Sequence, residues 1–137
     1  MSMSSIPANL RALVIERAGA RCEYCLLPAG VAFYSHEVDH VVARKHGGQT
    51  VAVNLALVCA RCNQHKGSDL GSLDPETGDF VFFYNPRTQR WDDHFALDGP
   101  RIVPLTPEGR ATVAIFQLNG PDRLQERELL IAAGRYP

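Results

Sequence analysis

The pattern of apolar and polar positions divides the first 70 residues into a helix, two short strands and a second helix. Apolar residues recur at helical spacing in IPANLRALVIERAG, with Pro7 near its start and Gly19 just past its end, which predicts a helix. Alternation and β-branched residues between Phe33 and Val42 predict a strand, and KHGGQT after it predicts a loop. NLALVC predicts a second strand, and CNQHKGSDL predicts the start of a helix.

The second half of the chain alternates turn signals with short apolar runs. DPETGDFVFFYNPRTQRW predicts a turn, an aromatic-rich strand, a turn at Asn85-Pro86 and another strand. Thr106 and Pro107 suit the N-cap and first position of a helix through Leu118. DRLQERELLIAAG predicts a last helix. We expect an α+β fold in one domain spanning 1–137, with a core at about 20–70 and a C-terminal extension at about 71–137 that holds a β-meander and two helices.

Length and charge narrow the classes of protein to consider. A chain of 137 residues suggests one domain with a modest core. Its first residues lack a signal-peptide pattern and no segment has the length of a membrane span, so we expect a cytoplasmic protein without a membrane partner. Residues 1–70 hold seven Lys or Arg and five Asp or Glu, a balance of +2, whereas residues 71–137 hold seven and ten, a balance of −3. Any phosphate contact would therefore come from a local group of basic residues, for which the candidates are Arg44, Lys45, Arg61 and Lys66; alternatively, these are solvated surface charges.

The four cysteines carry the most specific pattern. They form two C-x-x-C pairs, Cys22 with Cys25 and Cys59 with Cys62, separated by thirty-three residues. Two such pairs supply the four thiolates of a tetrahedral zinc site. A thioredoxin-type redox site needs only one pair in a βαβ setting, and a disulfide framework suits a secreted protein better. Four thiolates fill the coordination shell, so this zinc would be structural and would not bind substrate.

The polar residues between and after the cysteines follow a recognisable order. Asp39-His40 is followed by a Gly-Gly loop, Asn54-Leu, and Cys62-Asn63. This combination, in RCEYC and HEVDHVVARKHGGQTVAVNLALVCARCNQHKG, resembles the HNH endonucleases, a family built on the ββα-metal fold. The matching stretch covers residues 21–67. The C-terminal remainder also looks like the portion found in a bacterial stand-alone subgroup of that family.

The resemblance implies roles for particular residues. His40 would be the general base, and Asp39 and Asn63 would hold one catalytic Mg²⁺ or Mn²⁺. Asn54 would orient His40, either through the second ring nitrogen or through the neighbouring loop. His65 is an alternative ligand, but it lies two residues beyond Asn63, so on a helix the two side chains point roughly 200° apart.

The residue types suit phosphodiester hydrolysis independently of the family. A neutral imidazole has a pKa close to working pH and can take a proton from water. Carboxylate and amide oxygens favour Mg²⁺ or Mn²⁺ over zinc. However, in a regular strand Asp39 and His40 point to opposite faces, so both reach one site only if the strand ends, bulges or twists there. For His36 and Glu37 we favour a structural or solvent-facing role over a catalytic one.

The aromatic residues of the C-terminal half admit two interpretations. They could form a base-stacking platform or close a small core, and we favour the core; they are Phe80, Phe82, Phe83, Trp91 and Phe95. His94 could approach the active site, but a packed or surface position is the simpler expectation.

Three functions are compatible with these patterns. The first is a metal-dependent endonuclease acting on DNA, with RNA not excluded, working as a monomer or weak homodimer. The second is a zinc-stabilised nucleic-acid-binding module without catalysis, which leaves the offsets of Asp39, His40, Asn54 and Asn63 unexplained. The third is a redox or zinc-storage protein with reactive cysteines. The first accounts for the largest number of residues.

Overall fold

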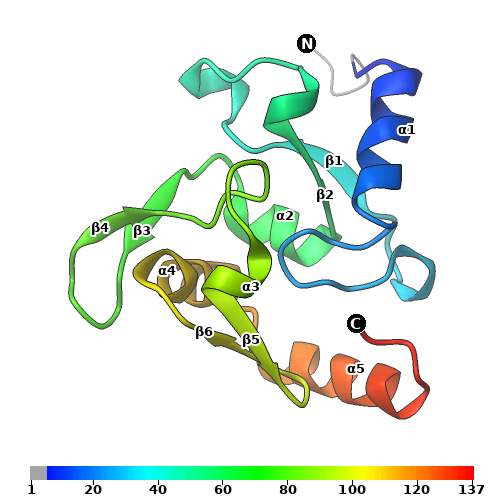
Figure 1. The fold of residues 1–137 in the computed structure, drawn as a ribbon, viewed down its shortest axis with the longest axis vertical. Coiled ribbons are helices and arrows are strands. Elements are labelled where there is room, and N and C mark those ends of the chain that lie inside the picture. The colour runs from blue at the N-terminus through cyan, green and yellow to red at the C-terminus, as the bar shows by residue number, and fades with distance from the viewer. Residues whose placement is uncertain (1–5) are drawn as a thin grey trace.

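Two antiparallel strands and one helix form the centre of the N-terminal half of the computed structural model, which describes residues 6–137 (Figure 1). Strand β1 (Glu37–His40) pairs with β2 (Leu55–Val58), with Glu37 opposite Val58 and His40 opposite Leu55. Helix α2 (Ala60–Lys66) follows β2 after Cys59. The predicted order of strand, loop, strand and helix is therefore confirmed, while the first five residues, where we expected no signal sequence, lie outside the described part.

Strand β1 is shorter than the alternation between Phe33 and Val42 suggested. Residues Ala29–Val31 form a 3-10 turn, and the chain then runs along the surface, where Phe33 and Tyr34 are exposed. Pairing begins only at Glu37, because β2 ends at Val58, the residue opposite Glu37. The alternation of apolar and polar residues in the sequence therefore covers more residues than β2 can pair with.

Helix α1 (Ala8–Arg17) covers one side of the β1–β2 pair, as the helical spacing predicted. Ile6, which precedes the helix, forms a small core with apolar side chains of the helix and both strands, namely Val14, Val38, Leu55 and Leu57. The Arg17 guanidinium donates to the carbonyl oxygens of Ala52 and Leu55, which fixes the helix against the start of β2. The first core layer therefore supports the strand that carries Asp39 and His40.

The C-terminal half contains two hairpins and three helices. Strand β3 (Gly71–Leu73) pairs with β4 (Phe80–Phe82), and β5 (Phe95–Asp98) pairs with β6 (Arg101–Pro104). The short α3 (Trp91–His94) precedes β5, and α4 (Pro107–Phe116) and α5 (Pro121–Ala132) follow β6. The α+β class is confirmed, although the strands form separate hairpins instead of the expected continuous meander.

The turn at Asn85-Pro86 explains that difference. The Gln89 side chain accepts a hydrogen bond from the backbone N–H of Asn85 (2.8 Å), and the Asn85 side chain accepts one from the N–H of Arg87 (2.8 Å). These contacts close a compact loop that leads into α3 instead of a strand. The next strand then begins at Phe95 and pairs forward with β6.

Helix α4 joins the two halves of the protein. Thr106 caps it, with the Thr106 hydroxyl accepting from the Gly109 N–H (3.1 Å), as the Thr-Pro pair predicted. The helix contacts α2, β3, β4 and β6. Its buried Ala111 and Phe116 share one apolar cluster with the four cysteines and with Tyr24. The extension and the cysteine region therefore have a common core.

No helix within residues 6–137 combines the length and the apolar character needed to cross a membrane.

Candidate zinc site and candidate active site

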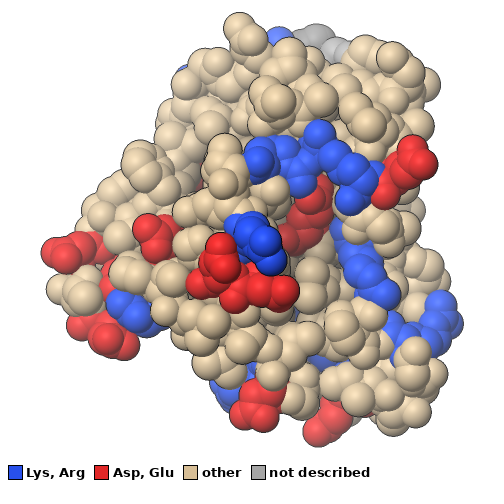
Figure 2. Space-filling view, in the orientation of Figure 1, with Lys and Arg blue, Asp and Glu red and all other residues tan. Residues whose placement is uncertain are grey.

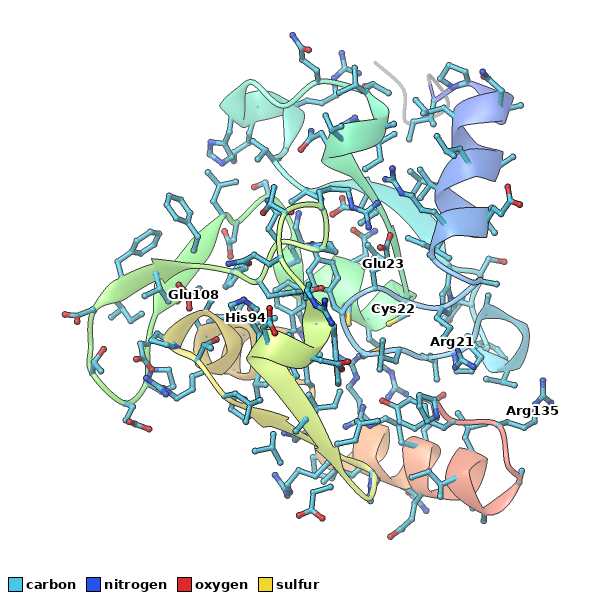
Figure 3. The ribbon with its side chains drawn as sticks, viewed as in Figure 1. Arg21, Cys22, Glu23, His94, Glu108 and Arg135 are labelled. Atoms are coloured by element: carbon cyan, nitrogen blue, oxygen red, sulfur yellow. The ribbon has the colours of Figure 1, made fainter. Side chains whose placement is uncertain are left out.

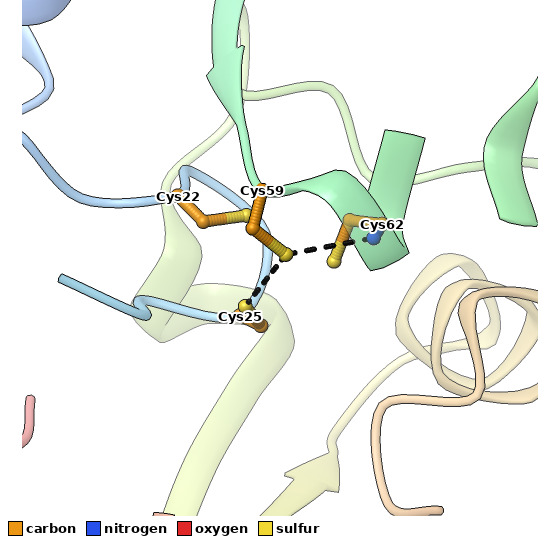
Figure 4. A group of neighbouring side chains, drawn as sticks. All are labelled: Cys22, Cys25, Cys59 and Cys62. Atoms are coloured by element: carbon orange, nitrogen blue, oxygen red, sulfur yellow. Dashed lines mark hydrogen bonds between the residues drawn. The ribbon is translucent and has the colours of Figure 1, made fainter. Parts of the chain in front are cut away.

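The four cysteines meet at one buried point between the loop that follows α1 and the start of α2 (Figure 4). Their sulfur atoms all lie within 4.8 Å of one another. The Cys25 and Cys59 sulfurs are 3.7 Å apart. Zn–S bonds of about 2.3 Å in a tetrahedron require sulfur separations of about 3.8 Å, whereas a disulfide needs about 2.05 Å. The four cysteines therefore fit a zinc ion and do not fit a pair of disulfides.

Helix α2 begins inside this cluster. The Cys59 sulfur accepts a hydrogen bond from the backbone N–H of Cys62 (3.5 Å), which makes Cys59 the N-cap of the helix (Figure 4). The zinc ligands and the start of the helix are thus the same residues. A metal at this point would fix the direction of α2 and the position of Asn63 on it.

Arg123 of α5 donates to the cysteine cluster, and the sequence analysis did not identify it. Its Nη2 lies 3.1 Å from the Cys62 sulfur and 3.7 Å from the Cys59 sulfur, and its Nη1 donates to the Phe116 carbonyl oxygen (2.8 Å). Burial disfavours the charged guanidinium, but the sulfurs of Cys62, Cys25 and Cys59 outweigh it and raise the pKa of Arg123. No local sequence pattern predicts this contact, because Arg123 and Cys62 are 61 residues apart in the chain.

The first cysteine pair also contacts the C-terminal half directly. Arg87 forms an ion pair with Glu23, Trp91 Nε1 donates to the Tyr24 carbonyl oxygen (2.9 Å), and the Tyr136 hydroxyl donates to the Cys25 carbonyl oxygen (2.7 Å). Figure 3 shows Cys22 and Glu23 near the middle of the molecule, where these segments meet. The extension is therefore packed against the cysteine cluster.

Strand β1 presents Glu37 and Asp39 on one face and Val38 and His40 on the other, as alternation requires. Helix α2 covers the first of these faces. The Asn63 amide donates to Glu37 Oε1 (3.3 Å), and Lys66 Nζ lies 2.9 Å from Asp39 Oδ2. The structure thus brings Asp39 and Asn63 to the same strand–helix interface, together with Glu37, for which we had expected only a structural or solvent-facing role.

Lys66 is not the exposed phosphate contact that the sequence suggested. Its side chain is 2% exposed, and its Nζ donates to the backbone carbonyl of His40 (3.0 Å) beside the Asp39 carboxylate. The prediction failed because buried lysines are rare and the sequence does not show the carboxylate that pairs with this one. The other three candidates for phosphate contacts, Arg44, Lys45 and Arg61, are exposed.

Lys66 forms an ion pair with Asp39 Oδ2 but makes no hydrogen bond to it. Asp39 Oδ2 is buried and receives no hydrogen bond from any described residue, although Lys66 Nζ is close to it. A buried carboxylate oxygen without a hydrogen bond is uncommon. The cation that faces this oxygen in the structure is the Lys66 ammonium, 2.9 Å away.

His40 lies at the end of β1 with 7% of its surface exposed. Its Nε2 is 2.8 Å from the hydroxyl oxygen of Thr50. Burial lowers the pKa of His40, and the positive charges of Arg44 and Lys66 lower it further, while Asp39 acts in the opposite direction. The ring is therefore neutral near pH 7. Its side chain leaves β1 on the face opposite Asp39, but β1 ends at this residue, so both side chains stand at the same end of the strand.

Asn54 contacts the loop after β1 and not the imidazole ring. Its Oδ1 accepts from the Val42 N–H (2.9 Å), and its Nδ2 donates to the carbonyl oxygens of Val42 and Gln49 (both 3.0 Å). These bonds close the loop so that Thr50 reaches His40. Of the two routes by which Asn54 could orient His40, the structure contains the one through the loop.

The Gly-Gly pair in this loop is required by its geometry. Gly47 has a positive φ of 92°, which favours glycine. A Cβ on Gly48 would lie 1.7 Å from the Val42 carbonyl oxygen and 2.8 Å from Asn54 Nδ2. Only a residue without a side chain therefore allows Asn54 to close the loop.

Three other histidines, His36, His65 and His94, make their contacts outside this site. His65 lines a different cavity, with Gln117 and Pro121, on the side of α2 that faces the start of α5. His36 Nε2 is 2.8 Å from the Leu27 carbonyl oxygen, and His94 Nδ1 is 2.6 Å from the Thr106 hydroxyl. His36 and His94 are thus held by neighbouring protein atoms, and His65 does not share the interface that Asn63 faces.

The aromatic residues of the extension divide into two groups. Phe83, Trp91 and Phe95 pack in or against the main core, as expected. Phe80 and Phe82 are 59% and 64% exposed on one face of β4, so the expectation of a core position is wrong for these two. Strand alternation puts Val81 inward and leaves both phenylalanines outside.

Comparison with known proteins identifies the segment that carries these residues. A family model described as HNH endonuclease matches residues 22–69. Over 55 residues the chain is 42% identical to the CRISPR-associated endonuclease Cas9 of Corynebacterium diphtheriae, an alignment that covers 39% of this chain and 5% of that relative. No solved structure matches. Residues 22–69 therefore match the HNH endonuclease family in sequence.

The match has a clear extent. It includes both cysteine pairs, both strands and α2, and it ends at Asp69, just before β3. The chain spans about a twentieth of the length of the curated relative that it matches. The extension from residue 71 onward lies outside the matched segment.

Proposed function

We propose that this protein is a metal-dependent endonuclease that hydrolyses phosphodiester bonds of DNA. The observation that carries the proposal is the strand–helix interface: Asp39, whose buried Oδ2 pairs with Lys66 but receives no hydrogen bond, lies next to His40 on the face of β1 that α2 covers with Asn63. This interface lies within residues 22–69, which match the HNH endonuclease family model, and that match adds independent support.

Asp39 and Asn63 would hold the divalent ion. A carboxylate oxygen and an amide oxygen suit Mg²⁺ or Mn²⁺, and two protein ligands leave positions for water and a substrate phosphate. When bound, the ion would polarise the phosphoryl oxygen and stabilise the departing 3′ oxygen. Glu37, which holds the Asn63 amide, would orient that ligand. The separation of His65 from β1 favours Asn63 over His65 as the second ligand.

His40 would act as the general base. If Nε2 carries a proton and donates it to the Thr50 hydroxyl, Nδ1 is the nitrogen that accepts a proton from water. The lowered pKa of His40 keeps the ring neutral at working pH, as a base requires. The water oxygen would then form a bond to phosphorus while the bond to the 3′ oxygen breaks. Asn54 would support this step by holding the loop that carries Thr50.

The four cysteines would hold a structural zinc ion, and the exposed residues Arg44, Lys45 and Arg61 would contact DNA phosphates. On the face that Figure 2 shows, Lys and Arg side chains lie interspersed with Asp and Glu side chains, so DNA contact there would come from small basic groups. A protein with one such site would nick one strand at a time.

A non-catalytic zinc module that binds nucleic acid is the second candidate. One observation favours it: Lys66 already neutralises Asp39, the main expected metal ligand. This candidate predicts DNA binding without a divalent-ion site beside His40.

Binding of Mn²⁺ to zinc-loaded protein, followed by electron paramagnetic resonance, separates these candidates. We expect one site that Asp39→Asn and Asn63→Ala each weaken at least 10-fold, while His65→Ala leaves it unchanged. Loss of the site in His65→Ala but not in Asn63→Ala would reverse the ligand assignment. A protein that binds DNA but no Mn²⁺ would support the second candidate.

A further inference from the structure

Phe33 and Tyr34 are adjacent exposed aromatic residues that the core does not need. Phe33 is 90% exposed and Tyr34 is 67% exposed, and their rings stand edge to face with centroids 4.8 Å apart. Single exposed apolar residues are common, but two neighbouring rings in contact with each other form a prearranged apolar surface. The roles assigned above to β1, α2 and the cysteines leave this pair unused.

The aromatic pair borders a hollow of about 390 Å³ beside the cysteine cluster. The first cysteine segment, α2 and α5 supply its walls, among them Leu27, Arg61 and Gln64. This volume lies within the range of about 300–1,000 Å³ that is typical of small-molecule sites. It is large enough for one nucleotide base and open enough for the base to remain part of a chain.

The charges around the hollow favour an anionic chain. Three arginines and one glutamate line it: Arg61, Arg123, Arg127 and Glu126. Arg123 and Arg127 are buried and donate to cysteine sulfurs and to the carbonyl oxygen of Leu118, respectively. Arg61 is exposed at the first turn of α2. The hollow therefore combines an apolar platform with an exposed cation at its edge.

This platform adjoins the two elements that carry the candidate active site, although no residue of that site lines the hollow. Tyr34 precedes Glu37, the first residue of β1, by three residues, which is at most about 10 Å of extended chain. Arg61 precedes Asn63 by two residues on α2, about 3 Å along the helix axis but roughly 200° around it, so the two side chains leave the helix on opposite sides. A nucleotide strand advances at least about 3.4 Å per residue. A strand that contacts Asn63 would therefore have to pass around α2 to reach the aromatic pair.

We propose that Phe33, Tyr34 and Arg61 form a subsite for an unpaired nucleotide of the DNA substrate, with the base stacked on the aromatic pair and its phosphate facing Arg61. This inference rests on the proposed function, in which DNA is the substrate. Stacking requires an unpaired base but does not read its identity, so the subsite favours single-stranded or distorted DNA over a regular duplex, without sequence specificity.

Fluorescence anisotropy on zinc-loaded His40→Ala protein tests the subsite without cleavage. Three labelled probes of about 20 units are compared: oligo-dT, an abasic strand with the same phosphates, and a duplex. The parent should bind oligo-dT at least 10-fold more tightly than the abasic strand, because stacking contributes about 1–3 kcal/mol per base. Adding Phe33→Ala and Tyr34→Ala should abolish that preference and leave duplex binding unchanged.

Two further variants make the test specific. Phe80→Ala with Phe82→Ala removes a matched exposed pair from β4 and should keep the preference for oligo-dT. Arg61→Gln should weaken oligo-dT and the abasic strand equally, because it removes a phosphate contact. Zinc content and circular dichroism confirm that each variant is folded.

The contrary outcomes are distinct. An unchanged preference in the Phe33→Ala/Tyr34→Ala variant, or a change only in self-association by sedimentation, would overturn the subsite. Equal binding of the parent to the abasic strand and oligo-dT would do the same. If oligo-dT binding depends on the aromatic pair but His40-containing protein does not cut DNA, the subsite stands and the proposed catalysis fails.

Discussion

At the scale of single residues, Lys66 links the end of α2 to both candidate catalytic positions on β1. Its Nζ lies beside the Asp39 carboxylate and donates to the His40 carbonyl oxygen, and its side chain is almost fully buried. Such a cation offsets the cost of burying Asp39, and its removal would leave that carboxylate without a countercharge. Lys66 therefore positions the end of β1 instead of contacting substrate.

Replacing Lys66 should destabilise the protein. We expect Lys66→Met to lower the free energy of unfolding by about 2–4 kcal/mol, because breaking a buried pair leaves an unpaired charge, although partial exposure of Asp39 reduces the effect. Urea unfolding of zinc-loaded protein measures it, with exposed Lys45→Met as the control. Adding Asp39→Asn should restore part of the loss. Equal stability of Lys66→Met and Lys45→Met would contradict this role.

At the scale of elements, the loop between β1 and β2 acts as the support for His40. Asn54 closes it, Gly48 lies against the Val42 carbonyl, and Thr50 meets the imidazole. The resemblance carried by Asp39-His40, Gly-Gly and Asn54 predicts that these residues belong to one unit, whereas it does not indicate the contact of Thr50 with His40. Local patterns predicted the loop because its contacts join residues no more than 12 apart in the chain.

A methyl group on Gly48 should disrupt this loop. Its Cβ would lie 1.7 Å from the Val42 carbonyl oxygen, so the backbone must shift away from Asn54. We expect Gly48→Ala to lower stability by about 1–3 kcal/mol and to slow DNA nicking by displacing Thr50. Gly30→Ala is the matched control, because its Cβ meets no atom within 4 Å. If both glycine variants behave alike in thermal melts and nicking assays, the loop does not support His40.

Most contacts between elements could not be predicted from the sequence. Two C-x-x-C pairs and a Thr-Pro helix start are recognisable from spacing alone, and both appear as expected. The Glu37–Asn63 hydrogen bond joins residues 26 apart, and Arg123 reaches a cysteine 61 residues away. Such pairs follow from how α2 and α5 pack. For the same reason the sequence could not separate exposed Phe80 and Phe82 from the buried aromatic residues of the extension.

At the scale of the whole molecule, the cysteine cluster and the extension depend on each other. Arg123 donates to the cysteine sulfurs, and Trp91 and Tyr136 donate to the carbonyl oxygens of Tyr24 and Cys25, respectively. A bound zinc ion with four thiolates would carry excess negative charge, which the Arg123 guanidinium offsets. The extension thus buttresses the matched domain from the side of the metal cluster.

Removing Arg123 should therefore weaken zinc binding. We expect Arg123→Gln to lower zinc affinity about 10–100-fold, the usual effect of losing a partner of a metal ligand. Competition with a chromophoric chelator measures the affinity, and Arg135→Gln, at the outer edge in Figure 3, is the control. Removal of zinc by a chelator should also shift the fluorescence emission of Trp91, the single tryptophan, because its indole N–H donates a hydrogen bond to the Tyr24 carbonyl oxygen. An unchanged zinc affinity in Arg123→Gln would contradict the coupling.

The central claim is that His40 activates water for metal-dependent DNA hydrolysis. Nicking of supercoiled plasmid by zinc-loaded protein, with Mg²⁺ or Mn²⁺ titrated in, tests it most directly. We expect nicking that requires the divalent ion, persists in His65→Ala and falls at least 100-fold in folded His40→Ala, because a general base contributes about 10²–10⁴ to the rate. Equal nicking by His40→Ala, or DNA binding without nicking at any concentration of either ion, would contradict it.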